Sequence, residues 1–308
     1  MASEIEGQSS PDGVLRRIVA FPLTLMVLGV VLVVLVASIT SGIVRRAHLP
    51  ANSPAQALGA LLVTVSAVLA YKAFKRWIER EPDRELPLDG LAIELPVGLL
   101  SGFLLFSIMA GLVALLHGLA VKGANDGPGQ FWAVLGMAMV SGVTEEILFR
   151  GLIMRQVEAW LGTWAALAIT SAMFGFGHIF NPGATIFAGF AIAMEAGILL
   201  GACYLYTRRL WLPIGVHAAW NFTQGWVFSA PVSGSKAPEG LLITTRSGPD
   251  WLTGGAFGLE ASVVAMMVAT LAGLVMLRLA VRRGRILAPT WRRSMVNGAE
   301  RPFEDQLK

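Results

Sequence analysis

Two carboxylates and a guanidinium interrupt an apolar run that extends from Phe131 to Leu161; they belong to Glu145, Glu146 and Arg150. In hydrocarbon an ionisable side chain is costly unless it has a partner, so such residues are rare in membrane spans. One interpretation is that they only pair with other helices. The other, which their rarity favours, is that they form a functional site.

Helix spacing separates the three groups. Glu146 and Arg150 are four residues apart and share a helix face, where they can form an ion pair that neutralises both charges. Glu145 points about 100° away from Glu146 and has no partner within its own helix. We therefore predict that the Glu146–Arg150 pair is largely structural. Glu145 is then the free carboxylate, which suits a general base.

Further polar groups lie in the apolar segments that follow. His178 comes four residues after Phe174, and Asn221 comes four residues after His217, so each pair shares a helix face. Glu195 lies between them in the sequence and is interpreted as structural or as facing an aqueous lumen. A single histidine on an apolar face is usually a satisfied core residue. Two histidines, an amide and an unpartnered carboxylate in neighbouring spans instead indicate a site.

Distance along the helices allows Glu145 and His178 to face each other. Each lies 15 residues from a predicted turn at residues 160–163. At about 1.5 Å per residue, both are about 22 Å from that turn. His217 does not follow this pattern, because it lies only six residues after Trp211. Helix length alone gives no reason for His217 to reach the same depth.

Two kinds of chemistry fit these groups. In the first, water attacks a carbonyl group, with Glu145 as the general base and His178 holding the water. His217 and Asn221 then donate hydrogen bonds to the oxyanion. In the second, His178, His217 and Glu145 bind a divalent metal such as Zn2+ and leave a fourth position open. The sequence leaves both open, although the zinc signature His-Glu-x-x-His of soluble enzymes is absent.

The composition predicts an all-α, polytopic transmembrane helical bundle. Hydrophobic residues make up 55% of the chain and charged residues 14%, compared with about 25% charged residues in soluble domains. Lys and Arg lie at segment ends without an aromatic-interleaved basic patch, so membrane lipids, and not nucleic acid, are the expected partners. Cys203 is the only cysteine, which excludes an intrachain disulfide and a cysteine cluster.

Apolar runs and turn signals divide the chain into about eight spans. In order, we predict a disordered cytoplasmic N-terminus at 1–17, helices 1–3 within 18–130, a catalytic core of helices 4–7 at 131–229, an outer loop at 230–255, helix 8 at 256–281 and a basic cytoplasmic tail at 282–308. The outer loop is either a cover over the mouth of the bundle or a flexible linker.

The distribution of positive charge predicts the orientation in the cell membrane. Eight spans place both termini on the same side. Nineteen of the 24 Lys and Arg residues lie on the faces joined to the termini. Because cytoplasmic loops carry the excess of Lys and Arg, both termini are predicted to be cytoplasmic.

Together, the polar motifs resemble the CPBP family of intramembrane proteases, which includes the type II CAAX prenyl endopeptidases and the bacterial Abi (bacteriocin-processing) proteins. The family pattern is Glu-Glu-x-x-x-Arg, then Phe-x-x-x-His, then His-x-x-x-Asn or Asp. The resemblance covers about Trp132–Phe228, and the pattern occurs there in order as Glu145-Glu146…Arg150, Phe174…His178 and His217…Asn221.

This resemblance implies an intramembrane peptidase, similar to CAAX prenyl protease 2, that cleaves a protein or peptide substrate within or beside the membrane. It implies that Glu145 activates water and that the site also includes Glu146, His178, His217 and Asn221. It leaves the metal question open, because the family is described both as metallo- and as glutamate-dependent. The alternative is a non-catalytic immunity, transport or scaffolding protein that uses the polar cluster for structure or ion passage.

Overall fold

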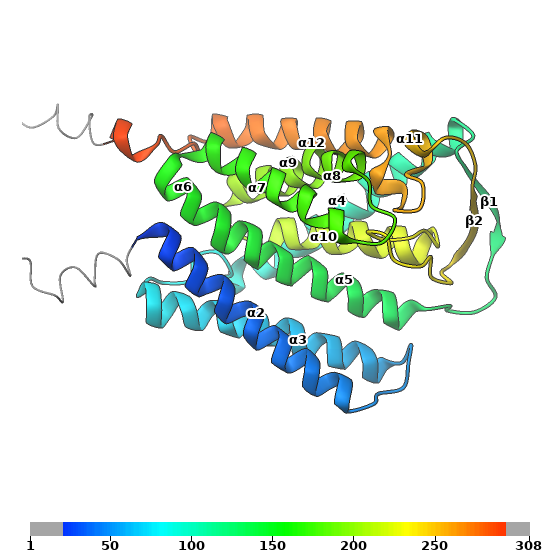
Figure 1. Cartoon of the computed structure of the whole chain (residues 1–308), viewed down its shortest axis with the longest axis horizontal. Helices are drawn as coiled ribbons and strands as arrows, with labels where there is room; N and C mark the ends of the chain where they lie inside the picture. Colours follow the sequence, from blue (N-terminus) through cyan, green and yellow to red (C-terminus); the bar gives the residue numbers. More distant parts are fainter. Residues whose placement is uncertain (1–20, 294–308) are drawn as a thin grey trace, which may run out of the picture.

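The computed structural model describes residues 21–293, and most of them lie in helices that run along one common axis (Figure 1). The predictions for 1–17 and for the end of the tail, from 294 onward, lie outside the described residues. The α-helices are α2 (Pro22–Arg46), α3 (Pro54–Ala73), α4 (Leu88–Leu115), α5 (Phe131–Glu146), α6 (Arg155–Leu161), α7 (Thr163–Gly177), α8 (Ile186–Ile192), α9 (Ile198–Thr207), α10 (Trp211–Phe222), α11 (Asp250–Thr253) and α12 (Val263–Arg282).

Several helices continue through a wider or a tighter turn. Wider π-helical turns are η1 (Phe74–Glu79), η2 (Ile147–Met154), η4 (Ala193–Gly197) and η5 (Thr223–Val227), and tighter 3-10 turns are η3 (His178–Phe180) and η6 (Leu259–Ala261). The π-helical turns join α5 to α6 and α8 to α9 into continuous rods. Because such turns redirect side chains and free backbone carbonyls, they are frequent at functional sites.

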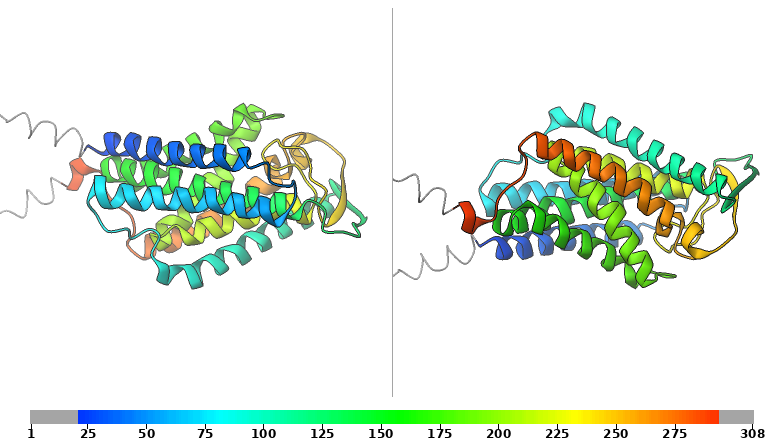
Figure 2. Two further views of the ribbon diagram at one scale, coloured as in Figure 1. Left: turned by 90° about the horizontal axis from the view of Figure 1, so that it is seen from below. Right: turned by 90° about the horizontal axis from the view of Figure 1, so that it is seen from above.

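Within residues 21–293, seven helical stretches are long and apolar enough to cross a membrane. They are Pro22–Arg46, Pro54–Glu79, Leu88–Leu115, Phe131–Leu161, Thr163–Phe180, Ile186–Thr207 and Val263–Arg282. This confirms the predicted helical transmembrane bundle. The predicted span that begins at Trp211 is not among them. Both ends of the described chain lie at the same end of the bundle, on the left in Figures 1 and 2.

Helix α10 lies inside the bundle and packs against α4, α5 and α9. Ten of its 12 residues are buried, so it faces other helices rather than lipid. Close packing against α4 depends on glycines, because an added Cβ at Gly98 would lie 2.4 Å from the Leu212 carbonyl oxygen and one at Gly102 would lie 2.3 Å from that of Val216. This packing positions His217, which immediately follows Val216.

A leucine at Gly102 should therefore destabilise the bundle. Its side chain would push the backbone of α4 away from α10, at a cost of about 1–3 kcal/mol or more. Gly111→Leu is the matched control, because Gly111 lies in the same helix and an added Cβ there meets no atom within 4 Å. Thermal unfolding in detergent measures both variants. Equal melting temperatures for the two would contradict this account of the α4–α10 contact.

The structure corrects two predicted segments. Helix 8 begins at Val263 and not at 256, because Gly258 has φ +132° and the Ser262 side chain caps the helix by accepting the Ala265 N–H. Within the segment 18–130 that was predicted to hold only helices, helix 3 ends at Leu115 and is followed by strand β1 (Leu119–Ala124), which pairs antiparallel with β2 (Leu242–Arg246) and has an irregularity between Val121 and Gly123. This small sheet lies at the end of the bundle opposite the chain ends (Figure 1).

Candidate active site

Glu146 is the buried acceptor for two side chains. It is the last residue of α5, at the start of the π-helical turn η2. Its Oε1 atom accepts hydrogen bonds from Arg150 Nη1 at 2.8 Å and from His217 Nδ1 at 2.9 Å. The ion pair that the four-residue spacing predicts is therefore present. It also holds a histidine from a helix 71 residues away in the sequence.

Arg150 connects this ion pair to two further segments. Its Nη2 atom donates to the Ala196 carbonyl oxygen at 3.0 Å and lies 3.5 Å from that of Gly197, around the end of η4. Its guanidinium carbon lies 4.7 Å from the centre of the Phe174 ring, which is a cation–π contact. Arg150 thus ties η2, η4 and α7 together from a fully enclosed position.

His217 lies between the two glutamates. Because an ionised carboxylate only accepts hydrogen bonds, Nδ1 of His217 carries the proton that is shared with Glu146. The other ring nitrogen, Nε2, lies 3.9 Å from Oε2 of Glu145. This separation is too long for a direct hydrogen bond, and the Oε2 atom is itself enclosed by the described residues around it. His217 is therefore fixed by one carboxylate and faces the other.

Glu145 differs from Glu146 in both contacts and access. The enclosed Oε2 atoms of both residues lack a hydrogen-bond partner among residues 21–293, but the Oε1 atom of Glu146 is bonded to Arg150 and His217. The Glu145 side chain is 30% exposed, and the Glu146 side chain is fully buried. An unpaired carboxylate oxygen on an accessible side chain is what a proton acceptor for water requires.

His178 is positioned by Phe174. At the end of α7 its Nδ1 atom donates to the Phe174 carbonyl oxygen at 2.7 Å, which leaves Nε2 as an acceptor in the neutral ring. The Phe174 ring lies 4.9 Å from the His178 ring and 5.9 Å from the His217 ring. Phe174 therefore contacts both imidazoles as well as the Arg150 guanidinium, which gives the aromatic residue of this motif a clear packing role.

Asn221 is held by a hydrogen bond to Ser141, which precedes Glu145 in α5. Its Nδ2 atom donates to Ser141 Oγ at 3.0 Å. Because the amide nitrogen carries two hydrogens, one remains for another acceptor. Ser141 on α5 thus orients an amide on α10. Gly142, the next residue, allows this approach, because an added Cβ there would lie 2.8 Å from that of Ala218.

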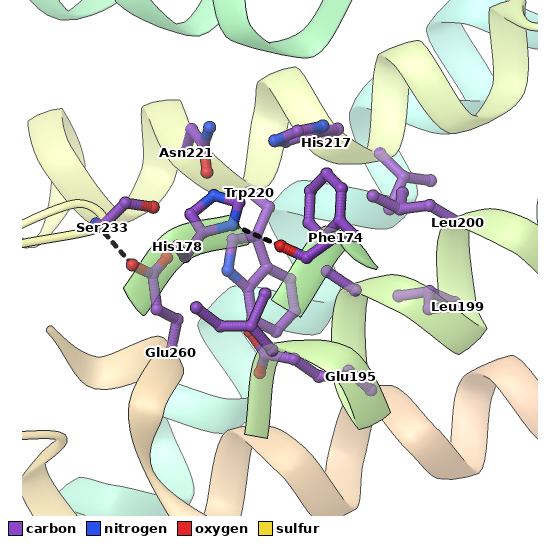
Figure 3. A pocket seen from close by; sticks show the side chains of 14 residues that line it. Phe174, His178, Glu195, Leu199, Leu200, His217, Trp220, Asn221, Ser233 and Glu260 are labelled. Atoms are coloured by element: carbon purple, nitrogen blue, oxygen red, sulfur yellow. Dashed lines mark hydrogen bonds between the residues drawn. The ribbon is translucent and has the colours of Figure 1, made fainter. Parts of the chain in front are cut away.

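A small cavity lies beside these residues (Figure 3). It offers about 40 Å³ to the centres of water molecules, which is enough for a few waters because one needs about 10–15 Å³. Apolar and aromatic side chains form most of its wall. Its polar lining consists of His178, Glu195, His217, Asn221, Ser233 and Glu260.

The structure brings the predicted residues together in two connected groups. The cavity is lined by His178, His217 and Asn221. Glu145 does not line the cavity but lies close to His217. Glu146 and Arg150 support His217 and Phe174 from the protein interior. The predicted approach of Glu145 and His178 is therefore indirect, with the His217 ring as the shared neighbour.

The geometry does not assemble a metal centre. Among the residues that the structure describes, no three His, Cys, Asp or Glu side chains are grouped so that they could hold a metal ion. The ligand set His178, His217 and Glu145 therefore does not fit a metal as these side chains stand. It remains a prediction from the sequence.

Two carboxyl groups of the cavity were not among the predicted site residues. Glu195 belongs to no motif, and the sequence indicates a structural role or a side chain that faces an aqueous lumen. Glu260 was not singled out, although it is the only charged residue between Trp251 and Arg278. An isolated acidic residue directly before an apolar span was the signal for it, but the predicted helix start at 256 placed it inside a helix instead.

One family model matches part of the chain. Residues 127–223 match the family model described as type II CAAX prenyl endopeptidase, Rce1-like. The matched segment contains all six residues of the predicted site, which are Glu145, Glu146, Arg150, His178, His217 and Asn221. No curated protein and no solved structure matches the chain. Membership of this family implies an intramembrane protease. The chain therefore carries, in residues 127–223, a domain of the Rce1-like type II CAAX prenyl endopeptidase family.

Proposed function

We propose that this protein is an integral-membrane endopeptidase in which Glu145 activates the water that hydrolyses a peptide bond within or beside the membrane. The observation that carries the proposal is the arrangement at His217. One of its ring nitrogens is bound to Glu146, and the other lies 3.9 Å from the free oxygen of Glu145. A water molecule between these atoms would be held by the imidazole and next to a base.

The first step is attack by this water on the carbonyl carbon. Glu145 accepts one proton as the oxygen of the water forms its bond to carbon. His178 can help to hold the water, because its Nδ1–H is directed to its own helix and Nε2 is left to accept a hydrogen bond. The Glu145 side chain is 30% exposed although its Oε2 atom is enclosed, so water would approach this carboxyl group from its exposed side.

The carbonyl oxygen then becomes an oxyanion and needs donors. Asn221 has one N–H that Ser141 does not use. His217 supplies a second donor when both of its ring nitrogens carry protons, because Nδ1 stays bound to Glu146 and Nε2–H can pass from the water to the oxyanion once the water has attacked. Donors that are already oriented stabilise the developing charge without reorganisation.

Asn221→Ala should lower kcat by about 10²–10³-fold, the usual cost of removing one oxyanion donor. The assay uses purified protein in liposomes and a library of internally quenched peptides, with cleavage sites read by mass spectrometry. Thr245→Ala is a surface control outside the site, because Thr245 is exposed and lies in β2 at the end of the bundle. Asn221→Ala with an unchanged kcat would contradict the oxyanion role.

The protein is further proposed to have both termini in the cytoplasm. Several helices end on the side of the bundle where residues 21 and 293 lie (Figure 1), and basic residues follow or close them there. These residues are Arg76, Arg208, Arg209, Arg282 and Arg283. The positive-inside rule assigns that end to the cytoplasm. The alternative is a non-catalytic immunity, transport or scaffolding protein. The family match favours the peptidase, because members of this family are described as endopeptidases.

A further inference from the structure

Two carboxyl groups line the cavity on segments that belong to none of the catalytic motifs. Glu195 lies in η4 and is 3% exposed, and Glu260 lies in η6 and is 4% exposed. The Glu195 Oε2 atom has no hydrogen-bond partner among residues 21–293. Within the same residues, no Lys or Arg forms an ion pair with either group.

A carboxylate enclosed without a cation is unfavourable, and two of them in one cavity repel each other. Burial raises the pKa of Glu260 to about 7, so at neutral pH this group carries a proton in about half of the molecules. The other titratable groups that line the cavity are His178, Glu195 and His217 (Figure 3). The cavity therefore holds a carboxylic acid as well as the imidazoles and the amide.

Hydrolysis of a peptide bond needs such an acid. An amide nitrogen is a poor leaving group until it is protonated, and a base that has just accepted the proton of water lies on the attacking side. Enzymes commonly divide these tasks between a carboxylate that stays ionised and a second one that its environment keeps protonated. Of the two carboxyl groups that could take these roles here, Glu145 has the more exposed side chain, and Glu260 is enclosed in the cavity.

We propose that Glu260 is a second catalytic carboxyl group, which donates a proton to the leaving nitrogen while Glu145 acts as the base. This inference rests on the proposed peptidase function. Glu260 is held in position by Ser233, whose backbone N–H donates to its Oε1 atom (Figure 3).

The protons balance in this scheme. One hydrogen of the attacking water passes to Glu145, and the oxygen, with the other hydrogen, bonds to the carbonyl carbon. When the C–N bond breaks, its electron pair stays on nitrogen, and nitrogen takes the proton of Glu260. The products are a carboxylic acid and an amine. Transfer of the proton from Glu145 to the Glu260 carboxylate, through solvent water, restores both groups.

The test compares two substrates of the same sequence, a peptide that the wild-type protein cleaves and the depsipeptide with an ester at the same bond. An ester oxygen leaves far more readily than an amide nitrogen, so it depends much less on an acid. Glu260→Gln keeps an oxygen for the Ser233 N–H and removes the proton donor. We expect it to lower kcat by about 10²-fold or more for the peptide and to change ester cleavage far less.

The control variant is Glu260→Asp, which retains a carboxyl group and should recover part of the peptide activity. An equal loss for peptide and ester in Glu260→Gln would show a structural role and overturn the inference while the peptidase function stands. Unchanged peptide cleavage would overturn it too. If the wild-type protein cleaves neither substrate, the peptidase function itself fails and this inference fails with it.

Discussion

Glu145→Gln should abolish peptidase activity and leave the protein folded. Glutamine has nearly the shape of glutamate but cannot accept a proton from water, and losing a general base costs about 10²–10⁴-fold in rate. Folding should be preserved because Arg150 and His217 are bonded to Glu146, and Glu145 lies 3.9 Å from the imidazole without a hydrogen bond. Cleavage of the quenched peptide library, together with thermal unfolding, measures both properties.

Glu146→Gln is the matched comparison for this variant. It removes the charge of the adjacent residue, which is fully buried and accepts from both Arg150 and His217. It should therefore lower the melting temperature as well as activity, whereas Glu145→Gln should lower activity alone. If Glu145→Gln retained wild-type turnover, Glu145 would not be the base.

Arg150→Ala should unfold the protein at a much lower temperature. The side chain is 1% exposed and is bonded to the Glu146 carboxylate and to the Ala196 carbonyl oxygen. Its removal leaves the Glu146 charge enclosed with only His217 as a partner. Breaking a buried ion pair by removing one partner typically costs about 3–5 kcal/mol, which is a large part of the stability of most domains.

Two other variants distinguish this loss from a general effect of removing positive charge. Arg150→Lys keeps the charge but cannot bind both Glu146 and Ala196 through a planar fork, so its loss should be intermediate. Arg278→Ala removes an exposed arginine from α12 and should leave the unfolding temperature nearly unchanged. Similar unfolding curves for Arg150→Ala and Arg278→Ala would contradict the structural role of the ion pair.

The local features of the site could be predicted from the sequence because helix periodicity determines them. The spacing of Glu146 and Arg150 predicts their ion pair, and the structure confirms it. The four-residue spacing of His217 and Asn221 places them on successive turns of α10, and both line the cavity. These relations involve only residues of one helix, so no knowledge of the neighbouring helices was needed.

The depth of His217 could not be predicted, because it depends on how helices pack. It lies near Glu146 because α10 is enclosed by other helices and approaches α4 at Gly98 and Gly102. A glycine pattern in an apolar helix does not reveal which partner it contacts. The same limit applies to strands β1 and β2, which pair with Leu119 opposite Arg246. The sequence of each strand alone does not indicate which distant segment it pairs with.

Glu260 was missed for a different reason. A helix predicted to start at 256 includes it in a membrane span, where it would be one more costly charge. In the structure, Gly258 and Ser262 delay the helix to Val263 and fold residues 259–261 into a turn at the cavity. The error in one helix boundary therefore concealed a residue of the candidate site.

Hydrolysis in water enriched in heavy oxygen tests the central claim most directly. In a single turnover of the wild-type protein in liposomes, water activated by Glu145 should place one heavy oxygen atom in the new carboxyl terminus of the cleaved peptide. Glu145→Gln, in equal amount, should produce no labelled terminus. If the first turnover of the wild-type protein gave unlabelled product, or no cleavage at all, direct attack by an activated water would be contradicted.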